Sequence, residues 1–164
     1  MDVLELLASQ HDEVDELIEQ LEGGGGDRAA LFAELADKLA AHATVEEKIF
    51  YPAAMYPNTS ELLHESVEEH LGVKRLIADM LDLDPDLDED RFDAALAMLK
   101  DQVSHHAPEE EEGKLFPKLR RLMTEDERAA VGNEVLAMFE ELIEHEPRQQ
   151  VPAQTAEPAP LPHL

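Results

Sequence analysis

The sequence predicts an all-α protein: an up-down-up-down four-helix bundle with an extra C-terminal helix and a disordered, proline-rich tail. Three observations support this prediction. Apolar residues recur at helical spacing through most of the 164 residues, and strand-like alternation is absent. Glycine, proline and helix-capping residues separate the helical stretches at short intervals. Apolar residues make up 43% of the chain, which is enough to build the core of one domain.

The first two predicted helices flank a run of four glycines. Asp2 begins a segment with the spacing of a capping box, so the first helix is expected at about residues 2–22. The glycines at 23–26 end that helix, because glycine is a poor helix former. Asp27 can cap a second helix, which is expected to end shortly before Pro52.

Two further helices follow and complete the bundle. A loop at residues 55–60 offers several capping residues for a third helix that runs to about residue 82. A turn at Asp84-Pro85-Asp86 separates it from a fourth helix, which begins near Glu89 and continues past His106. Because the connections are short, consecutive helices are expected to lie side by side.

The C-terminal part of the chain divides into a helix and a tail. A capping box at Thr124 predicts a fifth helix at about residues 124–144, with one apolar face that packs on the outside of the bundle. The bundle and this helix form one domain, residues 1–146. Residues 147–164 contain five prolines in eighteen residues and are expected to be disordered.

The apolar stripe of each bundle helix carries one histidine, and two of the stripes carry a glutamate about one turn later. An imidazole or carboxylate buried among aliphatic side chains is unfavourable without a partner, and a bound cation can pair with all of them. The candidate ligands are His11, His42, Glu46, His70, His106 and either Glu110 or Glu111.

This set of ligands favours a pair of metal ions. Four imidazoles and two carboxylates are too many for one tetrahedral zinc, but they suit two metals bridged by carboxylates. The chain has no cysteine, so thiolate sites are excluded. Mixed nitrogen and oxygen ligands favour iron over manganese or zinc. The alternative is that each histidine is a hydrogen-bonded structural group in a metal-free interaction bundle.

The second glutamate is not settled by the pattern. The apolar stripe before His106 projects onto Glu110, whereas the stripe after it projects back onto Glu111. Pro108 lies between His106 and both glutamates, so a kink or π-bulge is expected there. The upstream stripe slightly favours Glu110. The neighbours His105, Glu109 and Glu112 are expected to face solvent.

The charge balance narrows the classes of partner. With 39 acidic and 13 basic residues, the formal charge is −26, and such a field repels nucleic acid and anionic membrane surfaces. The first residues lack a basic segment, and no apolar run reaches the ~20 residues of a membrane span. We expect a cytoplasmic protein; no particular protein partner is indicated.

These residues resemble the hemerythrin-like, or HHE cation-binding, domain family over roughly residues 1–122. The matching segments are Gln10–Glu13, His42–Pro52, Glu69-His70 and His106–Pro117. The resemblance implies a four-helix bundle that holds a non-haem di-iron centre with an oxygen-derived bridge. It also implies that the four histidines are terminal ligands and that Glu46 and the later glutamate bridge the metals.

One position departs from the oxygen carriers of that family. Those proteins have two ligand histidines four residues apart on the third helix, whereas here Lys74 follows His70 at that distance. The missing histidine leaves a coordination position open to water or another ligand, and Lys74 either snorkels or pairs with a core carboxylate. The resemblance therefore favours sensing or detoxification of oxygen, peroxide or nitric oxide, with peroxide decomposition as a candidate activity, over transport. The alternative is a metal-binding module for iron or zinc storage, delivery or sensing without catalysis.

Overall fold

The structure, a computed structural model, describes residues 1–164 and contains helices without strands. The helices are α1 (Val3–Glu22), α2 (Arg28–Val45), η1 (Glu46–Phe50), α3 (Tyr51–Ala53), α4 (Ser60–Leu81), α5 (Glu89–Ser104), η2 (His105–Leu115), α6 (Phe116–Leu122), α7 (Glu125–Ile143) and η3 (Pro147–Gln154). The segments η1 and η2 are π-helical, and η3 is a 3-10 helix. The predicted all-α fold is confirmed. No helix is both long enough and apolar enough to cross a bilayer.

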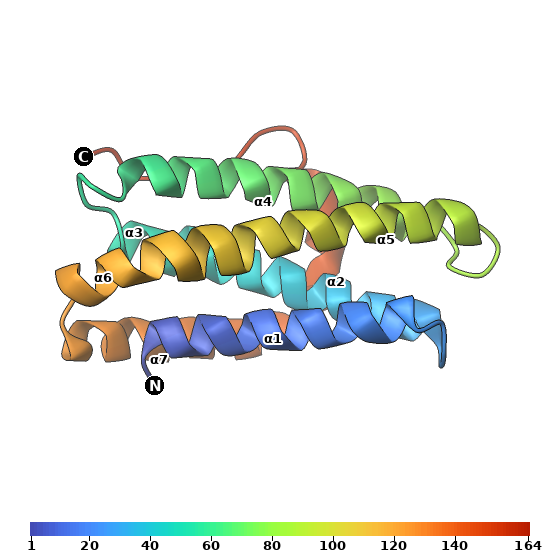
Figure 1. The fold of residues 1–164 in the computed structure, drawn as a ribbon, viewed down its shortest axis with the longest axis horizontal. Coiled ribbons are helices and arrows are strands. Elements are labelled where there is room, and N and C mark those ends of the chain that lie inside the picture. The colour runs from blue at the N-terminus through green and yellow to red at the C-terminus, as the bar shows by residue number, and fades with distance from the viewer.

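The long helices lie alongside one another in a bundle (Figure 1). In this view the chain runs along the bundle in α1 and returns through α2, and then does the same in α4 and α5. The segments α5, η2 and α6 follow one another as a single long rod. The helices begin where capping residues were predicted: the Asp2 carboxylate accepts a hydrogen bond from the Leu4 amide at 2.8 Å, and Asp27 does the same for Ala30 at 3.1 Å.

Two apolar clusters fill the two ends of the bundle, and the predicted metal ligands lie between them. In α1, Leu7 belongs to one cluster and Val14 to the other, with His11 between them. Along the α5–α6 rod, Val103 and Leu115 bracket His106 in the same way. A polar layer therefore crosses the middle of an otherwise apolar core.

Helix α7 packs on the outside of the bundle against α1 and α2, as its apolar face predicts. Its N-cap is Thr124, whose hydroxyl accepts from the Glu127 amide at 3.1 Å. Gly132 is buried where α7 meets the N-terminus, and a Cβ at this position would overlap the backbone oxygen of Met1. Glycine is therefore required there for close approach.

The C-terminal tail differs from the prediction of disorder. Residues 147–154 form the 3-10 helix η3, which crosses α2 and α4 near the middle of the bundle (Figure 1). Val151 is buried in the core, and the Arg148 guanidinium contacts the Asp37 carboxylate at 2.8 Å. Disorder was predicted from the proline content of residues 147–164, but a buried valine and an ion pair anchor the segment to the bundle. The packed structure therefore extends past residue 146.

We predict that Gly132→Val destabilises the protein by about 2 kcal/mol, because overpacking a close contact typically costs 1–3 kcal/mol. Urea unfolding followed by circular dichroism measures the change. Ala130→Val is the control. It introduces the same β-branched residue on the same helix, at a position that is exposed. Equal stabilities for the two variants would contradict the close approach of α7 to the N-terminus.

Candidate metal centre

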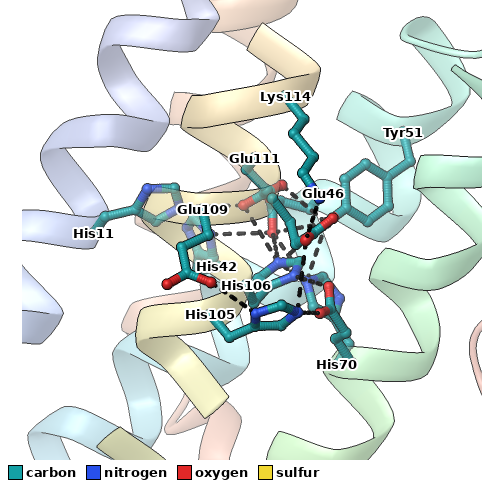
Figure 2. A network of polar contacts seen from close by, with 12 residues as sticks. His11, His42, Glu46, Tyr51, His70, His105, His106, Glu109, Glu111 and Lys114 are labelled. Carbon is teal, nitrogen blue, oxygen red and sulfur yellow. Dashed lines mark hydrogen bonds and ion pairs between the residues drawn. The ribbon is translucent and has the colours of Figure 1, made fainter. Parts of the chain in front are cut away.

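Six of the predicted ligands come together in the polar layer. His11 Nε2 lies 3.2 Å from Glu111 Oε1, and His42 Nε2 lies 3.1 Å from Glu46 Oε1. From the other side, His70 Nε2 lies 3.0 Å from Glu46 Oε1, and His106 Nε2 lies 3.3 Å from Glu111 Oε1. Each buried carboxylate therefore contacts one histidine from each side. Figure 2 shows Glu46 and Glu111 lying between the histidines.

The donor atoms form two groups that share one carboxylate. One group contains His11, His42, Glu46 and Glu111, and the other contains Glu46, His70 and His106. Within each group, the candidate ligand atoms lie within 4.8 Å of one another, and all of these residues are buried. Two neighbouring sites that share a carboxylate oxygen can hold two metal ions joined by that carboxylate.

The π-helical segment η2 decides which glutamate faces the centre. A π-helix hydrogen-bonds to the fifth residue along the chain, so residues five apart lie on the same face. His106 and Glu111 are five apart within η2, and both point into the polar layer. Glu110 instead accepts a hydrogen bond from Lys114 Nζ at 2.9 Å and lies outside the two groups. The π-bulge expected near Pro108 is present, and it turns Glu111, rather than the slightly favoured Glu110, towards the donor groups.

Each histidine also has an acceptor for its other ring nitrogen, on a different helix from its own. The four contacts run from His42 Nδ1 to Gln10 Oε1 at 2.6 Å, from His70 Nδ1 to Glu47 Oε2 at 2.8 Å, from His106 Nδ1 to Glu69 Oε1 at 2.9 Å and from His11 Nδ1 to Glu112 Oε2 at 2.7 Å. Together these contacts link α1, α2 with η1, α4 and η2 into a closed ring around the centre.

This ring orients the histidines for metal binding. Carboxylate and amide oxygens accept hydrogen bonds, so each Nδ1 carries the proton that it donates. The neutral tautomer then has its lone pair on Nε2, and all four Nε2 atoms face the centre. Metal-ligating histidines in proteins usually donate their second nitrogen to such an acceptor, which fixes the ring and raises its basicity.

Two buried side-chain atoms of this centre have no hydrogen-bond partner in the protein. They are His42 Nε2 and Glu46 Oε2. His42 Nε2 is close to Glu46 Oε1, but the contact lacks hydrogen-bond geometry. An unpartnered buried nitrogen and carboxylate oxygen are costly, and a cation that accepts electron pairs from both would satisfy them. The donor set and its orphaned atoms therefore fit a metal.

Tyr51 places a phenol in the same layer. Its hydroxyl donates to Glu111 Oε2 at 2.9 Å and lies 3.2 Å from both Glu46 Oε1 and His70 Nε2. Burial and the charges of Glu111 and Glu46 raise the pKa of Tyr51 well above its ordinary value, so the hydroxyl keeps its proton. Figure 2 shows this ring opposite His11, with the carboxylates between them.

Lys74 pairs with a core carboxylate. Its Nζ donates to Glu47 Oε1 at 2.9 Å, while the other oxygen of Glu47 accepts from His70. Both Lys74 and Glu47 have less than a tenth of their side-chain surface exposed. Lys74 thus acts on His70 through Glu47, and its ammonium group does not occupy a ligand position.

In the metal-free protein, the carboxylates favour protonated imidazoles. Burial lowers the pKa of His11, but the hydrogen bond and charge of Glu111 outweigh it and raise the pKa to about 9. Burial also opposes the charge on His106, yet Glu111 and Glu46 raise its pKa well above the ordinary value. For Glu46 the effects have the opposite signs. Burial raises its pKa, but its histidine neighbours outweigh burial and bring the pKa well below the ordinary value.

A cavity of about 40 Å³ adjoins the centre on the side of the cluster that contains Val14. All four candidate histidine ligands line it, and its wall is almost entirely carbon. By the same measure a cavity needs about 10–15 Å³ to hold one water molecule, so this space holds a small molecule.

Sequence reasoning missed the outer partners and Tyr51. Glu112 was expected to face solvent; its side chain is 37% exposed, and one of its oxygens also contacts His11 Nδ1. A signal was available, since Gln10, Glu47, Glu69 and Glu112 each adjoin a candidate ligand in the sequence. A neighbour of a ligand lies about a quarter-turn away on the helix, which directs it towards the adjacent helix.

A helical bundle with buried histidine and carboxylate groups at its centre defines a class of metal-binding proteins. The family model for the Hemerythrin HHE cation binding domain matches residues 2–119. That match spans more than half of the chain, and the protein belongs to this family. No curated protein and no solved structure matches the chain. The family and the buried cluster together indicate a metal centre, for which iron is the typical occupant.

We predict that the metal-free protein loses stability as the pH rises from about 6.5 to about 9. A histidine with a raised pKa in the folded state contributes stability below its unfolded pKa, and this is lost as pH passes through the folded pKa. For His11 the shift from 6.5 to about 9 corresponds to about 3 kcal/mol. Urea unfolding in the presence of a chelator measures it. Constant or increasing stability over this range would contradict the charged-imidazole arrangement.

Proposed function

We propose that the protein is a non-haem di-iron protein whose centre binds or reacts with dioxygen, peroxide or nitric oxide. The observation that carries this proposal is that Glu46 belongs to both groups of donor atoms, so one carboxylate can bridge two metals. The carbon-lined cavity beside the histidines has room only for a small molecule.

In this proposal the residues have distinct roles. His11 and His42 would hold one metal, His70 and His106 would hold the other, and Glu46 and Glu111 would be the carboxylates shared between them. Iron in this position would supply two one-electron redox changes. Gln10, Glu47, Glu69 and Glu112 keep the Nε2 atoms directed inward, and the apolar clusters exclude bulk water. The Tyr51 hydroxyl holds a proton 2.9 Å from Glu111 Oε2, where it can stabilise a charged oxygen.

Lys74 supports sensing or detoxification over transport. It stands where the oxygen carriers have another ligand histidine, and its hydrogen bond to Glu47 keeps its ammonium group from replacing that ligand. One coordination position therefore stays available. We propose a cytoplasmic protein whose ligand is a small oxidant, and the charge of −26 makes nucleic acid and anionic membranes poor partners.

The direct test is the reaction of the iron-loaded, reduced protein with each ligand in a stopped-flow spectrometer. We expect about two irons per chain and near-ultraviolet charge-transfer bands that develop after mixing with dioxygen or peroxide, and a distinct spectrum with nitric oxide. Repeated turnover of peroxide would establish an activity. A protein that binds iron but gives no spectral change with any of the three would instead be a storage or delivery module.

The glutamates provide a matched pair of variants for the ligand assignment. We predict that Glu111→Gln lowers the iron content to about half or less of the wild-type value and weakens the charge-transfer bands, because a bridging carboxylate is lost. Glu110→Gln, one residue away and also buried, should keep the wild-type content. Iron analysis of both purified proteins measures this. A larger loss in Glu110→Gln would refute the assignment.

A further inference from the structure

One wall of the cavity beside the metal centre comes from outside the four-helix bundle. Thirteen of the residues that line it belong to α1, α2, α4, α5 and η2, and the remaining one is Val151 of η3. The family match ends at residue 119. The structure that closes the cavity is therefore an addition to the part of the chain that defines the family.

The segment η3 is held across the bundle by specific polar contacts. The Arg148 backbone amide donates to Asp37 Oδ1 at 3.0 Å, and its guanidinium donates to Asp37 Oδ2 at 2.8 Å. After η3, Arg75 Nε donates to the Thr155 carbonyl at 3.0 Å. Before it, Glu146 has a positive φ of 48°, which reverses the chain after α7. Contacts on both sides thus set the position of Val151.

Val151 is 1% exposed and belongs to the same apolar cluster as Val14, Ile77 and Val103, all of which also line the cavity. Its isopropyl group contributes carbon only, so the wall offers no hydrogen bond to a ligand. The surface that faces the cavity is almost entirely carbon, so the size of the lining side chains decides which molecules fit.

We propose that Val151 is a specificity-determining residue: carried by η3, it closes the cavity beside the metal centre and limits the size of the molecule that the cavity admits. This proposal rests on the proposed function for the identity of the ligand, but the closure of the cavity is independent of any metal. A smaller residue at position 151 enlarges the space, and a larger one fills it.

The first experiment uses the full-length, metal-free protein and xenon as an apolar probe. Xenon binding is measured by 129Xe NMR for the wild type, Val151→Ala and Val151→Ile, since the conservative exchange to isoleucine preserves folding. Val135→Ala is the matched control, because Val135 is equally buried but belongs to the other cluster. We expect xenon affinity to rise several-fold in Val151→Ala, to fall several-fold in Val151→Ile and to stay unchanged in Val135→Ala.

The second experiment measures iron content and the rate of nitric oxide association for the same four iron-loaded proteins. We expect equal iron contents, with association faster in Val151→Ala and slower in Val151→Ile than in the wild type. Xenon affinities or association rates that do not depend on residue 151 would overturn the proposal. If the wild-type protein binds no iron, the proposed function is overturned instead. The xenon result would still decide whether Val151 closes the cavity.

Discussion

The fold depends on two carboxylates that have no access to solvent. Glu46 and Glu111 are both 0% exposed, and an ionised carboxylate in an apolar interior is strongly disfavoured unless positive charge surrounds it. In the metal-free protein His11 and His106, whose pKa values are raised, supply positive charge. A bound metal would supply positive charge in their place. Because the carboxylates need positive charge from the histidines or from a metal, the helices that carry these residues must meet at one level of the bundle. The apolar clusters fill the space on either side of that level.

The outer hydrogen bonds from the histidine Nδ1 atoms fix how the helices around the buried carboxylates are arranged. Each Nδ1 contact joins a histidine to a neighbouring helix, so displacement of one helix disturbs two histidines. The ring is not symmetric: Gln10 is neutral, whereas Glu47, Glu69 and Glu112 are acidic. A carboxylate partner makes an imidazole a stronger electron donor than an amide does. His70 and His106 both have carboxylate partners, while His42 has an amide, so the two groups of donor atoms differ in the partners of their histidines.

The periodicity of the sequence was sufficient to predict the helices of the bundle and the buried candidate ligands that follow an α-helical repeat. His11, His42, Glu46, His70 and His106 all lie on apolar stripes, and burial follows directly from such spacing. The choice between Glu110 and Glu111 could not be made, because the two flanking stripes require different residues and only the hydrogen-bond pattern of η2 reconciles them. The segment η3 was missed for another reason. Composition measures average tendencies, and it is hardly changed by a single valine that lines a cavity or by an Arg148 paired with a distant Asp37.

The π-helical segments explain how one chain satisfies both the centre and the core. A regular α-helix continued through η2 would place Glu110 in the centre and then rotate the apolar residues that follow out of the core by about 100°. The wider π-helical turn absorbs one residue, so Glu111 faces the centre and Leu115 and Leu119 still reach the apolar cluster. Pro108 lies within this segment and has no amide hydrogen to donate, which favours a departure from the α-helical pattern. The π-helical segment therefore lies between the candidate ligands and the apolar residues that follow them, where one α-helical repeat cannot bury both sets.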